Sequence, residues 1–208
     1  YNHPLIPVLQ DPQSPIDTLE RLGSTSEERL SKAPTMREKG FVRAAEAFAF
    51  TDGSLGEKRL AWMYAMQDLY EKFPDDREVA AFYAVSMISG ATVSNDGRVL
   101  NNFLTESGTE ITMRAGAIAM DLFRENPDHP GAAHYIIHSF DHPTYAPLAL
   151  SAAEKYASIA PAVSHARHMP THIFIQHGMW NKVSEWNDSA FNAGKNLWEP
   201  GDSAGDQN

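Results

Sequence analysis

Four histidines form two pairs with the same internal spacing. The stretches HYIIH (134–138) and HMPTH (168–172) each place two histidines four residues apart, and the second pair follows the first by 34 residues. Residues four apart share one face of an α-helix, where two imidazoles can bind the same metal ion. The repeated spacing indicates one structural unit that occurs twice in the chain.

The composition restricts which metal these histidines could bind. The chain contains no cysteine, so every ligand is an imidazole or an oxygen. Such ligands suit zinc, copper, iron or nickel and do not suit calcium or magnesium. The predicted ligands are His134, His138, His168 and His172. Further candidates, as direct ligands or as partners of a ligand, are His3, Glu78, Asp141, His142 and His165.

The same histidines have an alternative interpretation. A single histidine on a helix more often makes a hydrogen bond between helices than it binds a metal, and several together can contact a bound peptide. The metal hypothesis therefore depends on the two pairs acting together. Neither pair contains the glutamate of the HExxH protease motif, so no catalytic residue is assigned and enzymatic activity stays open.

Charge and hydropathy exclude other classes of function. The formal net charge is −10, and no basic stripe of the kind that binds nucleic acid is visible. No apolar run approaches the roughly 20 residues of a membrane-spanning helix. The absence of cysteine is compatible with an oxidising compartment, so both the cytoplasm and an oxidising compartment remain open.

The periodic segments predict an all-α protein. They are rich in Ala, Leu, Met, Glu and Lys and contain no long β-branched alternation. Thr35 is the expected N-cap of the first long helix. One or two short helices are expected between residues 4 and 33, and a further helix ends near His177. The remaining predicted helices cover residues 36–50, 56–73, 77–88, 110–125, 131–140, 146–158 and 181–197.

Prolines at regular positions divide these helices into pairs. Pro34, Pro74, Pro127 and Pro161 each follow one predicted helix and precede another. A helix pair that recurs every 34 residues is typical of tetratricopeptide repeats. We predict one right-handed α-solenoid of antiparallel helix pairs over residues 1–208. Its parts are a partial repeat at 1–34, repeats at about 35–74, 75–127, 128–161 and 162–200, and a tail at 201–208.

The two ends of the chain repeat internal patterns. YNHP (1–4) is similar to FDHP (140–143), which ends a predicted first helix, and the tail stops where another repeat would start. We therefore expect the chain to be a fragment of a longer protein.

Residues 72–193 resemble a group of bacterial tetratricopeptide-like proteins. The resemblance is carried by HPGAAHYIIHSFDHP (129–143) and HARHMPTHIF (165–174). It implies a solenoid whose first helices line a concave groove and place ligand-binding residues there, and it implies no particular activity. The expected function is transition-metal binding in this groove, with a metal-dependent enzyme acting on a small molecule as its extension. The alternative is an adaptor that binds a peptide or protein partner in the same groove.

The proline of HMPTH allows two local structures. If a helix begins near His168, Pro170 lies in its first turn, where the missing N–H does little harm. If the helix begins at Ser164, Pro170 should kink it. Both structures keep His168 and His172 on one side.

Overall fold

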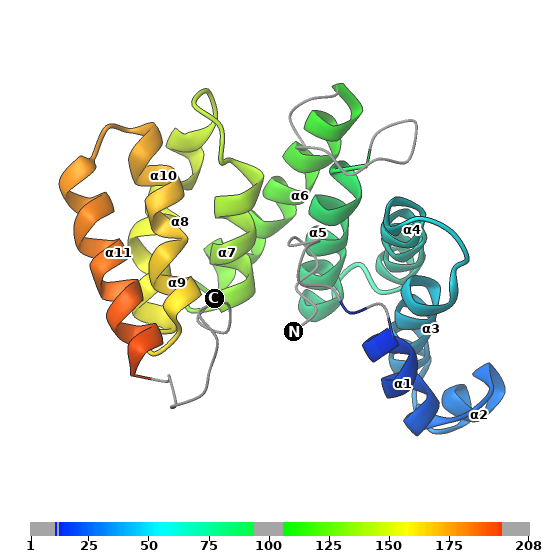
Figure 1. The fold of residues 1–208 in the computed structure, drawn as a ribbon. Coiled ribbons are helices and arrows are strands. Elements are labelled where there is room, and N and C mark those ends of the chain that lie inside the picture. Colours follow the sequence, from blue (N-terminus) through cyan, green and yellow to red (C-terminus); the bar gives the residue numbers. More distant parts are fainter. Residues whose placement is uncertain (1–10, 12, 94–105, 197–208) are drawn as a thin grey trace. The chain divides into compact units, whose positions relative to one another are not determined.

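The computed structural model describes residues 11, 13–93 and 106–196, and that part of the chain is helical without a strand (Figure 1). The elements are α1 (Gln13–Leu22), α2 (Ser26–Ser31), α3 (Met36–Phe50), α4 (Leu55–Lys72), α5 (Arg77–Ala91), α6 (Glu106–Glu125), α7 (Pro130–Ser139), the 3₁₀ turn η2 (Ala146–Ala149), α8 (Leu150–Ile159), α9 (Ser164–His168), α10 (Pro170–Gln176) and α11 (Trp180–Lys195). The predicted all-α class is confirmed for these residues. The solenoid, its handedness and the repeat boundaries stay predictions.

Local capping explains where two of the long helices begin. Thr35 Oγ1 accepts a hydrogen bond from the Glu38 backbone N–H, and the Glu38 carboxylate accepts one from the Thr35 backbone N–H. Ser54 and Glu57 make the same reciprocal pair at the start of α4. Each capping box satisfies backbone donors that the first turn leaves without a partner. α3 therefore starts where the sequence predicted, and α4 starts one residue earlier.

Contacts between Cα atoms cluster into two compact units, Tyr1–Ala115 and Gly116–Asn208, with the division inside α6. In the first unit, α3 packs against α4 and α4 packs against α5. Met66, Leu69, Val79, Ala84 and Met87 are buried in this unit. Burial of these apolar side chains is the main favourable contribution to its folding.

The second unit packs α7 against α8, α8 against α10, and both α9 and α10 against α11. Its core includes Ile136, Ile137, Ile173 and Phe174. These apolar residues are buried, whereas none of the histidines in α7, α9 and α10 is. The apolar face of each helix is thus fixed in the core, which sets the direction of the histidines on the adjoining faces.

Pro170 combines the two structures that the sequence allowed. A helix begins at Ser164 and ends at His168, and a new one begins with Pro170 as its first residue. Met169 between them keeps helical dihedral angles, with φ −53° and ψ −38°. The His172 N–H donates to the Met169 carbonyl at 3.2 Å, a short-range bond of the 3₁₀ type. The break is therefore a local interruption between His168 and Pro170.

The N-cap of α5 also pairs with α3, which leads to a first prediction. Asp76 accepts a hydrogen bond from the Val79 N–H at 3.0 Å and pairs with the Arg37 guanidinium. We expect Asp76→Ala to destabilise the protein by about 1–2 kcal/mol through loss of the cap. Asp76→Asn keeps a capping oxygen and should cost less, because the partly exposed ion pair contributes at most about 1 kcal/mol. Urea denaturation measures both, and equal losses would contradict the capping argument.

The Asp76 carboxyl also predicts a pH dependence. The hydrogen bond from Arg37, aided by the Val79 N–H, lowers its pKa below the ordinary value of 3.8. The charged form therefore stabilises the folded state above pH 3.8, and this contribution is lost as the pH falls through the lowered folded-state pKa. The stability difference between the wild type and Asp76→Asn should accordingly shrink in acid. Denaturation curves at neutral and acidic pH measure it.

Gly116 of α6 supports the end of α7 and yields another prediction. A Cβ atom at this position would lie 2.5 Å from Cζ of Phe140 and 2.9 Å from Cβ of Ser139. Alanine is the better helix former, but overpacking here should outweigh that gain and cost about 1–3 kcal/mol. Thermal denaturation of Gly116→Ala measures the loss. The double variant with Phe140→Leu removes the nearest ring atoms, so it should lose less than the two single changes added together.

Candidate metal centre

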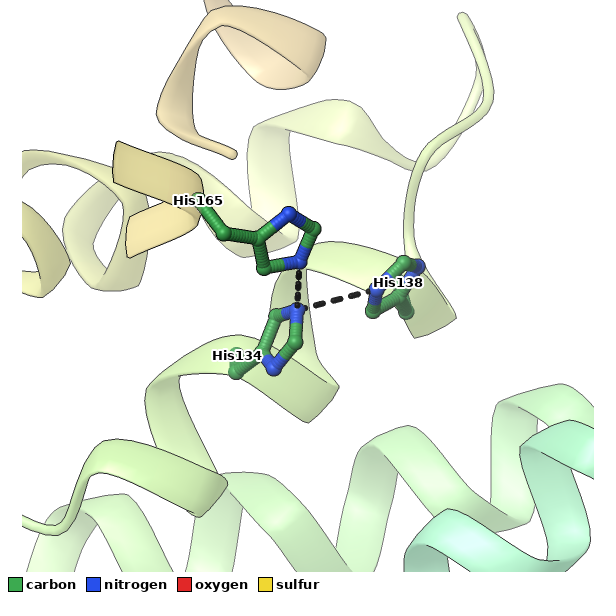
Figure 2. A group of neighbouring side chains, drawn as sticks. All are labelled: His134, His138 and His165. Atoms are coloured by element: carbon green, nitrogen blue, oxygen red, sulfur yellow. Dashed lines mark hydrogen bonds between the residues drawn. The ribbon is translucent and has the colours of Figure 1, made fainter. Parts of the chain in front are cut away.

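Three histidines of the second unit converge on one point (Figure 2). His134 and His138 lie one turn apart on α7, and His165 lies on α9. The Nε2 atom of His134 is 3.0 Å from Nε2 of His138 and 3.1 Å from Nε2 of His165. One ligand atom from each residue lies within 4.8 Å of the other two. We call these three residues the histidine trio.

The trio is positioned by the packing of its helices. His129 caps α7, its Nδ1 accepting from the Ala132 N–H at 3.2 Å, and Pro130 follows as the first helical residue. Ile136 and Ile137 are buried, while His134 and His138 are half-buried. The helix thus carries its imidazoles at the edge of the core, where they are shielded from bulk water only in part.

A tyrosine from a third helix holds the central ring. The ring of Tyr156, on α8, stacks on that of His134 with centroids 5.3 Å apart and an interplanar angle of 12°. Tyr156 is only 6% exposed, so its own position is set by the core. This contact restricts rotation of the His134 ring and so directs its Nε2 atom toward the other two histidines.

The two short contacts at His134 cannot both be full hydrogen bonds. A ring nitrogen of histidine carries either one proton or one lone pair, and that single feature serves one well-aligned bond. Three Nε2 atoms around a shared cation have no such conflict. Ligand nitrogens 2.0–2.1 Å from a tetrahedral zinc ion lie about 3.3 Å from one another. The two separations at His134, 3.0 and 3.1 Å, are a few tenths of an ångström below that value, and the ligand atoms of His138 and His165 lie within 4.8 Å of each other.

His168 and His172 make a second pair, which we call the histidine dyad. Their Nε2 atoms are 3.1 Å apart. Nδ1 of His172 lies 2.7 Å from Oδ2 of Asp141, just beyond α7, and Nδ1 of His168 lies 2.8 Å from Oδ1 of Asn187 on α11. Gln176 donates to the other oxygen of Asp141 at 3.3 Å.

The structure groups the predicted ligands differently from the repeat register. His134, His138, His168 and His172 do not form one group within ligand distance. The residue that lies close to His134 and His138 is His165. The register compared equivalent positions, whereas His165 meets His134 across neighbouring helices at a separation of 31 residues. His165 stands one helical turn before His168, and the sequence named it only among the further candidates.

The remaining candidates lie outside both groups or outside the described residues. Asp141 contacts the dyad, as a partner of His172. Nδ1 of His142 accepts a hydrogen bond from the Thr144 N–H at 3.2 Å. Glu78 is exposed in the first turn of α5, where a carboxylate is favourable for the helix dipole. His3 lies outside the described residues.

No protein family, curated protein sequence or solved structure matches the chain. Among the described residues, no helix is long and apolar enough to cross a membrane. The resemblance to tetratricopeptide proteins therefore stays a prediction from the sequence. What can be said of function rests on the geometry of the two histidine groups.

Proposed function

We propose that the protein binds a divalent transition-metal ion through His134, His138 and His165. The observation that carries the proposal is the convergence of three Nε2 atoms, with His134 Nε2 within 3.1 Å of both others. These rings come from two different helices, so their meeting does not follow from the spacing of one helix. A shared cation is the partner that satisfies all three nitrogens together.

The ligand set favours zinc or copper. Borderline metals bind neutral imidazole well, and three protein nitrogens leave a fourth position of a tetrahedral ion open. Iron and nickel also accept imidazole and belong in the same test. Structural zinc sites use four protein ligands, whereas catalytic sites use three and keep one position for water or substrate. The trio, with three protein nitrogens, has the number of ligands of a catalytic site.

A metal-dependent enzyme acting on a small molecule is the extension of this proposal. A zinc ion held by three imidazoles supplies a Lewis acid that polarises a carbonyl group or lowers the pKa of a bound water to about 7. The chain's own contribution is to fix the ligand geometry. Tyr156 does so by stacking on His134, and the half-buried position of the trio limits the access of water.

Metal analysis of protein purified without a histidine tag tests the proposal. We expect the wild type to bind zinc or copper in equilibrium titration against a chromophoric chelator, and to unfold at a higher temperature when loaded. An ion at 100 times its dissociation constant adds about 2.7 kcal/mol of stability. His134→Ala with His165→Ala should weaken this site by more than the roughly 10–100-fold that loss of an outer-sphere partner costs.

His142→Ala is the matched control, because it removes an imidazole from the same region without touching the trio. It should keep the wild-type affinity. Unchanged metal affinity in the His134→Ala, His165→Ala variant would show that the trio is not the site. Wild-type protein that binds none of the four metals, but is stabilised by a peptide or protein partner, would instead support the adaptor alternative.

A further inference from the structure

The dyad contains an arrangement that the trio does not explain. If Nδ1 of His172 donates to Asp141 and Nδ1 of His168 donates to Asn187, both neutral rings carry their proton on Nδ1. Each Nε2 atom then presents a lone pair, and the two atoms are 3.1 Å apart. Two lone pairs at this distance repel each other unless a proton or a metal ion lies between them.

We infer that His168 and His172 form a second metal site, built for a divalent transition-metal ion such as copper(II), nickel or zinc. The inference does not rest on the function proposed for the trio, because the two groups share no residue. A separation near 3.1 Å suits two neighbouring positions of a four- or six-coordinate ion. A linear two-coordinate ion, with nitrogens about 2 Å away on opposite sides, would need roughly 4 Å.

The surroundings of the dyad distinguish it from an arbitrary pair of surface histidines. Histidine ligands in built metal sites commonly donate their second ring N–H to a carboxylate, a carbonyl or a water, which fixes the tautomer and raises the basicity of the ligand nitrogen. With the ring protons on Nδ1, Asp141 takes this role for His172 and the Asn187 side chain takes it for His168. Gln176 in turn donates a hydrogen bond to Oδ1 of Asp141, the oxygen that does not contact His172. The site thus draws side chains from α9, α10 and α11, together with Asp141 just beyond α7.

The exposure of the dyad indicates what completes the coordination. His168 is exposed, and 36% of the His172 side chain is accessible to solvent. Two protein nitrogens leave two or more positions for water or for a small anionic ligand. The site should therefore exchange its ion more readily than the trio. Copper(II) should bind most tightly, in keeping with the general order of affinities of divalent metals for nitrogen ligands.

The experiment compares four proteins in copper(II) and nickel titrations: the wild type, His134→Ala with His165→Ala, His168→Ala with His172→Ala, and all four changes together. We expect the trio variant to retain one equivalent of metal and the fourfold variant to lose it. Absence of that equivalent would overturn the inference and leave the function proposed for the trio untouched. If the trio variant still binds metal but the His168→Ala, His172→Ala variant, which keeps the trio, binds none, the function proposed for the trio fails and the inference about the dyad stands.

Variants in the trio background test whether the dyad is a built site. Asp141→Asn keeps the side-chain shape and an acceptor oxygen but removes the charge, and Asn187→Ala removes the acceptor of His168. Each should lower the copper(II) affinity by about 10–100-fold. His177→Ala, whose ring contacts the Ile173 carbonyl, is the control and should leave the affinity unchanged. Equal affinity in all three would mean an adventitious chelate and would overturn the inference.

Spectroscopy identifies the ligand atoms directly, which a loss of affinity caused by misfolding cannot imitate. Copper(II) bound to the dyad should give an electron paramagnetic resonance spectrum with coupling to two imidazole nitrogens. In ¹⁵N-labelled apoprotein, the His172 ring should show its proton on Nδ1. A neutral ring of either His168 or His172 with its proton on Nε2, or a spectrum without nitrogen coupling, would contradict the assignment. Far-ultraviolet circular dichroism confirms that each variant is folded.

Discussion

The packing of α7, α8 and α10 into one apolar core determines where the imidazoles of this protein meet. Ile136 and Ile137 of α7 and Ile173 and Phe174 of α10 have almost no exposed surface. Neither α7 nor α10 can therefore rotate about its axis without exposing large apolar side chains. At about 25 cal/mol per Å² of apolar surface, such a rotation would cost several kcal/mol. α7 and α10 therefore each present their histidines in one direction. α9, which carries His165 and His168, is held in turn by the buried Ala166 and by Met169 directly after it.

The polar surroundings add a finer level of control. Tyr156 stacks on the central ring of the trio, and Asp141 and Asn187 each hold one ring of the dyad. These contacts act on ring orientation and on the position of the ring proton, which the hydrophobic core cannot set. The two groups also differ in exposure and in contacts. The trio is half-buried and its rings meet at Nε2 of His134, whereas the dyad is more exposed and its Nδ1 atoms contact Asp141 and Asn187.

Much of the fold could be predicted because its signals are local. Thr35 with Glu38 and Pro130 directly after His129 mark helix starts through contacts between residues close in sequence. Contacts between helices have no comparable signal. The 34-residue register paired His134 with His168, yet a side chain on one helix meets whichever residue faces it across the interface, and here that residue is His165. Asn187 had no signal at all, because an asparagine on an amphipathic helix usually faces solvent. Pairing in space depends on the angle and offset between helices, which the repeat period does not contain.

The interruption at Pro170 has a mechanical consequence. His168 belongs to the last turn before the break and His172 to the first turn after it, so the distance between their Nε2 atoms depends on the bend of the chain at that point. An ion held by both would act as a clamp across the joint. By linkage, whatever straightens or bends the joint changes the affinity for the ion, and the ion resists such bending by the same free energy. A helix without the proline would hold the two rings at a fixed separation and would lack this coupling.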